Sequence, residues 1–293
     1  MGCDRVQLVG TVSFLLLLSS AQGWGKDGHA IVCKIAQARL STAAAEAVTK
    51  LLPESAQNDL ASQCSWPDDV KREIPWSSSL HFADTPDSVC SYDDSRDCVD
   101  QRTGIKNRCV VAGISNYTNQ LLEYGSYTDS PYNLTEALLF LSHFMGDIHQ
   151  PLHCGFVSDQ GGNAINVLWY NETQKLHHVW DDSIIETQFQ KFNDDLGDLV
   201  DAIQINITKV WADEVEDWEY CSNNEISCPA IYASESAEDA CKWAYKDASE
   251  GSVLEDEYFF SRFPIVNFRL AQGGVRLAAA LNRIFDTQYP VLI

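Results

Sequence analysis

Residues 133–147 read NLTEALLFLSHFMGD, which is the strongest helical pattern in the chain. Asn133 is a suitable N-capping residue, and the pattern ends before Pro151, which cannot continue a helix. His143 and Asp147 are four residues apart and therefore share one helix face. They could form a surface ion pair worth roughly a few tenths of a kcal/mol. Their neighbours are largely apolar, however, so a metal ion that satisfies both groups is the favoured interpretation.

Other segments also predict helices and indicate an all-α fold. Apolar residues follow helical spacing over 31–40, and Ser41 or Thr42 can cap a second helix over 43–52, which Pro53 stops. Further helices are expected over 104–124, 198–218 and 265–285. The β-like run 164–170 follows two glycines and fits a short hairpin. With no linker composition and no repeat, we predict a single, mainly helical domain.

The first 23 residues have the three regions of a secretory signal peptide. Arg5 precedes a mainly apolar run over 6–18, and small residues lead up to Gly23. Cleavage there would leave Trp24 as the first residue of a domain over 24–293, with further C-terminal processing after about residue 285 left open. No other segment approaches about 18 consecutive apolar residues, so no membrane span is expected. We therefore expect entry into the secretory pathway and an extracellular or vacuolar destination.

Cysteines and glycosylation sequons agree with export. Nine of the ten cysteines remain once Cys3 leaves with the signal, which suggests four disulfides and one free thiol. Proximity suggests that Cys98 pairs with Cys109 and Cys221 with Cys228, and Cys154 is the candidate for the free thiol. The pairing within Cys33, Cys64, Cys90 and Cys241 is open. A four-cysteine zinc site is disfavoured because there is no C-x2-C pair. Predicted glycosylation sites are Asn116, Asn133, Asn171 and Asn206.

The charge balance limits the classes of function. Forty-two acidic residues against 20 Lys and Arg give a formal net charge of -22. Such a chain is not expected to grip duplex nucleic acid through a broad basic face. A nucleic-acid enzyme whose positive charge comes from bound metal remains compatible with this composition.

A second histidine–aspartate pair strengthens the metal hypothesis. His177 and Asp181 are again four residues apart, and His149 and His153 follow the 133–147 helix in GDIHQPLH. Imidazole and carboxylate are ligands that zinc accepts, so two such pairs in a helical, exported protein favour zinc.

These motifs make the chain resemble the plant bifunctional nucleases. They are zinc-dependent, single-strand-preferring class I nucleases and also have fungal relatives. The matching stretches are 24–29 (WGKDGH), 66–68 (WPD), 80–87 (LHFADTPD), 141–153, 161–167 (GGNAINV) and 176–181 (LHHVWD). They occur in family order, and no motif of comparable specificity follows Asp181.

The resemblance implies three Zn²⁺ ions in one cleft. It assigns the first to Asp68, His81, His143 and Asp147, the second to His153, His177 and Asp181, and the third to His29, a bridging Asp147 and the backbone amine and carbonyl of Trp24. The amine becomes available as a ligand only after signal cleavage. His149 and His178 receive no metal and are expected to play supporting or surface roles.

The resemblance also implies an activity. Zinc-activated water would attack phosphorus in line, and zinc would stabilise the leaving 3′ oxygen, giving 5′-phosphate products from single-stranded DNA and RNA together with 3′-nucleotidase activity. Asp68 and Asp147 are expected to serve catalysis, and Lys71 occupies the position of a family cation that stabilises charge. Phe82, Asp84 and Asn163 match residues that bind a base. The segment 156–160 departs from fungal members near this pocket.

Two other hypotheses remain open. Bacterial zinc phospholipase C shares the helical trinuclear scaffold and the N-terminal tryptophan ligand. Phe82, Asp84 and Asn163 favour nucleic acid over lipid, and no exposed hydrophobic run suggests membrane docking. A zinc-binding glycoprotein without activity would lack a ligand, whereas every ligand position here is filled. We expect a monomer without an obligate protein partner.

Overall fold

The computed structural model describes residues 23–125, 130–193 and 195–286. The signal peptide predicted over 1–23 lies outside these residues except for Gly23, as does the segment after 286. The described α-helices are α1 (Lys26–Gln37), α2 (Thr42–Leu51), α3 (Trp66–Asp69), α4 (Asp94–Asp97), α5 (Val110–Leu121), α6 (Leu134–Asp147), α7 (Leu176–His178), α8 (Ile184–Phe192), α9 (Leu196–Lys209), α10 (Val215–Glu219), α11 (Pro229–Asp239) and α12 (Asp256–Phe285). Short 3₁₀ turns are η1 (Glu54–Ala56), η2 (Leu60–Gln63), η3 (Pro75–Leu80), η4 (Pro151–Cys154) and η6 (Ser222–Asn224), and π turns are η5 (Val179–Ser183) and η7 (Ala240–Ala244).

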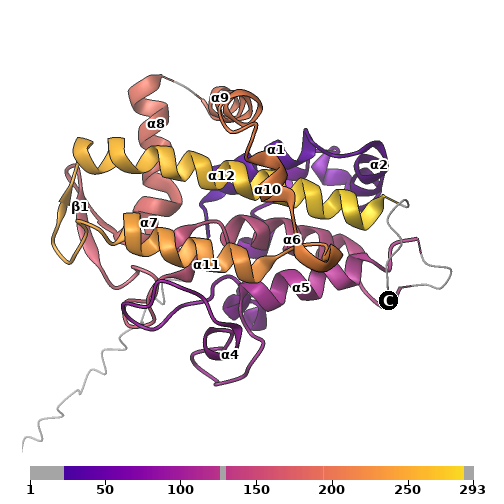
Figure 1. Ribbon diagram of the computed structural model, residues 1–293, viewed down its shortest axis with the longest axis horizontal. Helices are drawn as coiled ribbons and strands as arrows, with labels where there is room; N and C mark the ends of the chain where they lie inside the picture. Colours follow the sequence, from indigo (N-terminus) through magenta and orange to yellow (C-terminus); the bar gives the residue numbers. More distant parts are fainter. Residues whose placement is uncertain (1–22, 126–129, 194, 287–293) are drawn as a thin grey trace, which may run out of the picture.

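The core forms where α1, α5 and α6 meet the long helix α12. Figure 1 shows α12 crossing the molecule, with α11 beside it and α5 and α6 on the same side as α11. From Ala137 to Asp147 every residue of α6 is buried, so this helix passes through the interior. The mainly helical prediction is confirmed. Among the described residues, no helix has both the length and the apolar character needed to cross a bilayer.

Two predicted helix starts are confirmed, and three predicted helix boundaries are wrong. Ser41 caps α2, and Asn133 caps α6 by accepting a hydrogen bond from the backbone of Glu136. The helix predicted over 104–124 begins only at Val110, because the preceding residues close a disulfide loop. The helix predicted over 198–218 is two helices, α9 and α10, separated by a turn in which Trp211 packs against Phe268.

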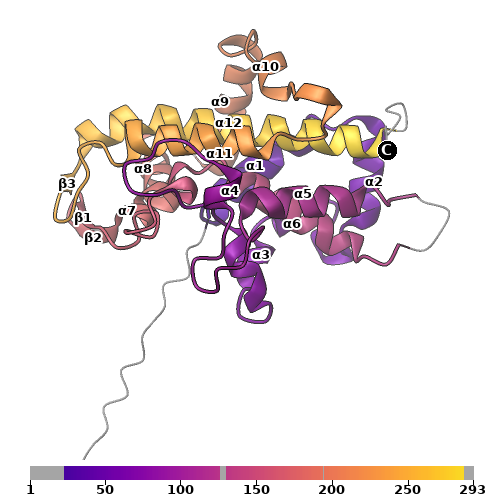
Figure 2. The same cartoon turned by 60° about the horizontal axis from the view of Figure 1, so that its bottom comes forward.

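The third boundary concerns α12, which extends well before the predicted start at 265 and contains Pro264. Pro264 is exposed, so its missing N–H costs no buried hydrogen bond, while Phe259 and Val266 on either side are fully buried. Burial of the surrounding apolar residues thus outweighs the local effect of proline. Figure 2 shows α9 and α10 on one side of α12 and α3 on the other.

A small sheet supplements the helices. β1 (Asn166–Trp169) and β2 (Glu172–Lys175) form the expected antiparallel hairpin, with Asn166 opposite Lys175. A third strand, β3 (Val253–Leu254), pairs in parallel with β1 and was not expected. Two residues carry too little pattern to reveal a strand whose partner lies more than 80 positions away.

The described residues contain four disulfides, two between cysteines close in the sequence and two between more distant ones. Cys98 pairs with Cys109 and Cys221 with Cys228, the two pairings expected from proximity. The two that the sequence left open are Cys33–Cys64 and Cys90–Cys241, and Cys154 is a buried free thiol.

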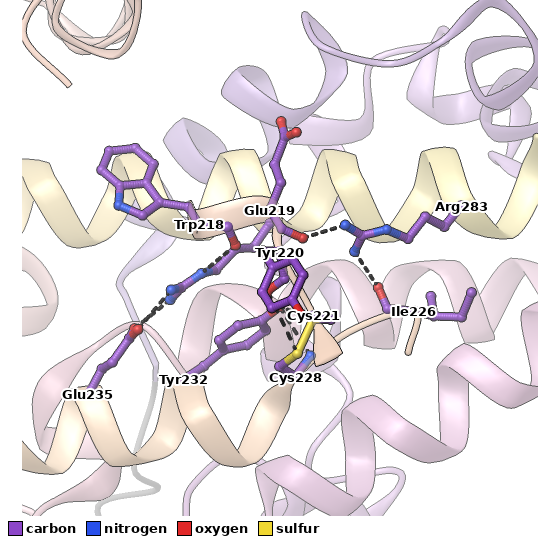
Figure 3. Close-up of a disulfide and its surroundings, with 10 residues drawn as sticks. Trp218, Glu219, Tyr220, Cys221, Ile226, Cys228, Tyr232, Glu235 and Arg283 are labelled. Atoms are coloured by element: carbon purple, nitrogen blue, oxygen red, sulfur yellow. Dashed lines mark hydrogen bonds and ion pairs between the residues drawn. A yellow bond between two sulfur atoms is a disulfide. The ribbon is translucent and has the colours of Figure 1, made fainter. Parts of the chain in front are cut away.

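The Cys221–Cys228 loop is anchored to α12 and α11 (Figure 3). Tyr232 of α11 accepts a hydrogen bond from the backbone N–H of Cys228 through its hydroxyl. Arg283 of α12 donates to the backbone carbonyls of Glu219, which precedes the loop, and of Ile226, which lies inside it. These contacts hold the α10–α11 connection against the long helix.

Candidate active site

Eight histidine and aspartate side chains converge from segments spread over 150 residues. All eight are buried or nearly so. His29 lies on α1, Asp68 on α3, His81 just after η3, His143 and Asp147 on α6, His153 on η4, His177 on α7 and Asp181 on η5. Three groups in this set could hold a metal ion: His29, Asp68 and His143; His81, His143 and Asp147; and His153, His177 and Asp181.

The first predicted ligand set is brought together. His81 Nδ1 lies 2.9 Å from Asp147 Oδ2 and 3.0 Å from His143 Nε2. His143 Nε2 is 3.1 Å from Asp147 Oδ2 and 3.5 Å from Asp68 Oδ1, and His81 Nδ1 is 3.7 Å from Asp68 Oδ1. Four donor atoms from three segments, α3, the residue after η3 and α6, therefore lie close to one point.

These separations fit zinc. Ligands about 2.0–2.1 Å from a tetrahedral zinc ion are about 3.3 Å apart, the middle of the observed range of 2.9 to 3.7 Å. Several buried polar atoms in the site also make no hydrogen bond within the described part of the chain. They are His81 Nε2, both ring nitrogens of His29 and Asp147 Oδ1. Burying so many unpaired polar atoms is costly, and a bound cation would compensate for part of that cost.

Backbone carbonyls orient three of the imidazoles. His143 Nδ1 is 2.8 Å from the Cys64 carbonyl oxygen, His153 Nδ1 is 2.6 Å from that of His81, and His177 Nδ1 is 2.6 Å from that of Gly161. A carbonyl only accepts, so each Nδ1 must carry a proton, and in the neutral ring Nε2 then keeps the lone pair that can bind a metal. An imidazole held by a carbonyl in this way is typical of metal-binding histidine.

The second predicted set also lies together, and it has a supporting residue that the sequence reasoning missed. His177 Nε2 is 3.4 Å from Asp181 Oδ2. The other oxygen, Oδ1, accepts a hydrogen bond of 2.6 Å from the fully buried Gln150, whose own Oε1 accepts one from the backbone of Leu152. Gln150 thereby fixes which oxygen of Asp181 faces His177. The only signal in the sequence was its position inside GDIHQPLH.

The predicted third set is arranged around the start of α1. His29 Nε2 lies 3.4 Å from Asp147 Oδ1, and its ring stacks on His143 with centroids 3.8 Å apart. Trp24 is fully buried, and a Cβ placed on Gly23 would lie 1.5 Å from Asp147 Oδ1 and 2.8 Å from His29 Nε2. The backbone entering Trp24 therefore passes directly beside the donors of His29 and Asp147.

Burial and charge shift the pKa values of these groups in opposite directions. Burial, assisted by the positive charge of Lys71, lowers the pKa of His81 to about 3. Burial also disfavours the charged form of His143, but Asp147 and Asp68 outweigh it and raise its pKa to about 10. The two buried carboxylates thus stabilise positive charge at this point, and a bound metal ion would supply that charge.

A cleft of about 870 Å³ opens over the donor groups. Asp68, Lys71, Phe82, Asp84, Asn163 and His177 are among its lining residues. Lys71 is buried, in contrast to its exposed neighbour Arg72, and its Nζ lies 2.6 Å from Asp68 Oδ1. The cleft therefore brings the predicted cation next to the predicted metal ligands.

The residues expected to bind a base all line this cleft. The backbone of Ala83 donates to the carbonyl of His153, and that of Thr85 donates to the carbonyl of Gly155, so the 82–84 segment is held against η4. Burial, followed by the nearby carboxylate of Asp159, raises the pKa of Asp84 well above its usual range. The amide nitrogen of Asn163 donates to the Gln160 carbonyl, which leaves its side-chain oxygen as an acceptor.

The remaining histidines lie outside the donor groups. His149 is buried, with Nδ1 2.7 Å from the Met145 carbonyl oxygen and Nε2 3.0 Å from a nitrogen of Arg276. His178 is partly exposed and pairs with Asp182 at 3.0 Å. Within residues 23–125, 130–193 and 195–286, neither belongs to a cluster that could hold a metal. The sequon residues Asn116, Asn133 and Asn171 are exposed and Asn206 is half-buried.

Comparison with known proteins identifies the family. The S1/P1 nuclease family model matches residues 24–286. Endonuclease 2 of Arabidopsis thaliana is 56% identical over 287 residues, covering 97% of this chain and 98% of that protein, and Endonuclease 4 of the same plant is 52% identical, covering 93% and 92%. Nuclease S1 of Aspergillus oryzae is 28% identical, covering 92% and 94%. These matches favour a nuclease over a phospholipase: the chain is a phosphodiester-hydrolysing nuclease and belongs to the S1/P1 nuclease family.

Proposed function

We propose that this chain is a zinc-dependent endonuclease that cleaves single-stranded DNA and RNA to 5′-phosphate products and also removes the phosphate of 3′-nucleotides. The observation that supports this most directly is the convergence of three histidine–aspartate groups beneath a cleft that also contains Lys71 and Phe82. Three Zn²⁺ bound there would supply an activated water and Lewis-acid stabilisation of phosphate oxygens.

The side chains of the chain itself would position the phosphate. Asp68, His81, His143 and Asp147 would hold one ion, and His153, His177 and Asp181 a second. Lys71 Nζ would donate to a phosphate oxygen and add positive charge where negative charge develops. Its ion pair with Asp68 and its burial fix the ammonium group in place before substrate arrives.

The third ion would need the processed N-terminus. Before cleavage the nitrogen of Trp24 is an amide, which does not bind metal as an amine does, and Gly23 lies beside His29 and Asp147. Removal of residues 1–23 would create the amine and clear that space. We propose that the protein enters the secretory pathway, is secreted or vacuolar, and matures as a single domain over 24–293. The sequons at Asn116, Asn133, Asn171 and Asn206, which are exposed or half-buried, would be glycosylated on this route.

Base recognition would be general. The ring of Phe82 would stack on a base, and Asp84 and Asn163 would form hydrogen bonds with its edge. Stacking contributes about 1–3 kcal/mol per base and accepts every base. A flexible single strand can place one base and its phosphate in the cleft at once, and we propose that such strands and 3′-nucleotides are bound by a monomer.

The test is hydrolysis by the secreted, signal-cleaved protein with and without a zinc chelator. We expect chelator-sensitive release of 5′-mononucleotides from a single-stranded oligonucleotide and of phosphate from a 3′-mononucleotide. A short-chain phosphatidylcholine is assayed in parallel. Cleavage of the lipid without release of nucleotides would refute the proposal and support the phospholipase alternative. Hydrolysis of neither substrate would support a zinc-binding glycoprotein without activity.

A further inference from the structure

Two arginines that the proposed chemistry does not use line the same cleft. Arg72 follows Lys71 directly, and Arg102 lies on the loop between Cys98 and Cys109. Both side chains are exposed. Among the described residues, neither guanidinium makes an ion pair within 4.0 Å or a hydrogen bond, in contrast to Lys71, which is paired with Asp68. Both arginines are therefore available to an incoming ligand.

The loop that carries Arg102 is held in a defined shape. Its ends are joined by the Cys98–Cys109 disulfide, and the backbones of Asp100 and Ile105 are hydrogen-bonded across it. The buried carboxylate of Asp100 accepts hydrogen bonds from the backbone N–H groups of Arg102, at 2.9 Å, and Thr103, at 3.1 Å. The backbone of Arg102 is thus fixed at the wall of the cleft, and only the side chain has to be ordered on binding.

The negative net charge of the molecule means that binding of a polyanion depends on positively charged groups close to the bound strand. With a net charge of -22, the protein repels a polyanion at long range. At physiological ionic strength this repulsion is screened beyond about 8 Å, so the groups next to the strand decide whether it stays. Guanidinium groups match phosphate geometry with two parallel hydrogen bonds. The Asp100 carboxylate, which also lines the cleft, interacts electrostatically with Arg102 without coming within ion-pair distance of it. Two arginines without a close ion pair, in one cleft of an acidic protein, are suited to bind phosphates.

We propose that Arg72 and Arg102 bind phosphates of the strand adjoining the cleaved linkage, so that they select polynucleotides over mononucleotides. This inference rests on the proposed nuclease function. A 3′-mononucleotide has a single phosphate, which occupies the position beside Lys71 and the metal ligands. Only a longer strand has further phosphates that reach the two arginines.

The experiment compares Arg72→Ala and Arg102→Ala with Lys50→Ala, a control at an exposed position of α2 that changes the net charge equally. Each protein is assayed on a single-stranded decanucleotide and on a 3′-mononucleotide between 50 and 200 mM salt. For each arginine removed, we expect the slope of log kcat/KM against log salt on the oligonucleotide to become shallower by about 0.7. Between 50 and 200 mM salt, kcat/KM of the variant should then fall by a factor about 2.6 times smaller than that of the unaltered protein. On the mononucleotide, kcat/KM stays within about twofold of that of the control.

Two results would overturn the inference. Equal losses of kcat/KM on both substrates would mean that the arginines contact the scissile phosphate or are needed for folding. Thermal unfolding of each variant distinguishes these two cases. Salt slopes equal to that of Lys50→Ala would show that no phosphate contact was lost. Failure of the proposed function itself looks different, because the unaltered protein would then hydrolyse neither substrate.

Discussion

Gln150→Leu should selectively weaken the second metal site. The substitution keeps the size of the side chain but removes the 2.6 Å hydrogen bond to Asp181 Oδ1 and the acceptor for the backbone N–H of Leu152. A hydrogen bond to a charged group contributes about 1.5–3 kcal/mol, and an unsatisfied buried donor costs about 1–3 kcal/mol. We therefore expect a loss of about 3–5 kcal/mol in the free energy of unfolding.

The effect on metal binding should exceed this general destabilisation. Without Gln150, either oxygen of Asp181 can turn toward His177, so the carboxylate is no longer oriented before the ion arrives. Loss of an outer hydrogen bond of this kind typically lowers metal affinity about 10–100-fold. The assay is zinc retention against a competing chelator, with total zinc per protein measured by elemental analysis.

Gln188→Leu is the matched control. Gln188 is also buried and exchanges two hydrogen bonds with Asn267, on helices that contribute no metal ligand. Both variants should unfold more easily, but only Gln150→Leu should release zinc at lower chelator concentration. If the two variants retained zinc equally, the inferred orientation of Asp181 by Gln150 would be wrong.

Four further predictions concern other parts of the molecule. Asp147→Ala should lower hydrolysis by more than about 100-fold and reduce bound zinc, because its carboxylate faces two ligand groups; a fully metallated, active variant would contradict this. Leu138→Ala, in the fully buried part of α6, should cost about 2–5 kcal/mol in denaturant unfolding. Replacing Cys90 and Cys241 together by serine should cost about 2–5 kcal/mol, since their disulfide closes a loop across 151 positions. Burial opposes ionisation of Glu235, but Arg276 and Arg269 outweigh burial and lower the pKa of this carboxyl. The ionised carboxylate should therefore stabilise the fold above pH 4.5, and this stabilisation should fade as the pH falls below 4.5. In denaturant unfolding, the stability difference between the unaltered protein and Glu235→Gln should accordingly narrow in acid.

The ligand types and the central helices could be predicted from the sequence because their signals are local. The capping residue Asn133, the apolar run of α6 and the four-residue spacing of His143 and Asp147 all lie within one helix. Hydrophobic periodicity does not define where a helix ends when distant contacts decide it. Pro264 stays inside α12 because the residues around it are buried, which local propensity cannot indicate.

Only the tertiary structure decided how the donor atoms are oriented and what surrounds them. The carbonyls that orient the imidazoles come from Cys64, His81 and Gly161, between 16 and 79 residues away from the rings they contact. Three other features also depend on how the chain folds. They are the Cys33–Cys64 bridge, the hydrogen bond between Gln150 and Asp181, and the cleft that Arg72 and Arg102 both line. Residue identity thus determines which atoms can bind a metal. Packing between distant segments determines which lone pairs face the same point, because hydrogen bonds that orient a side chain act through space rather than along the chain.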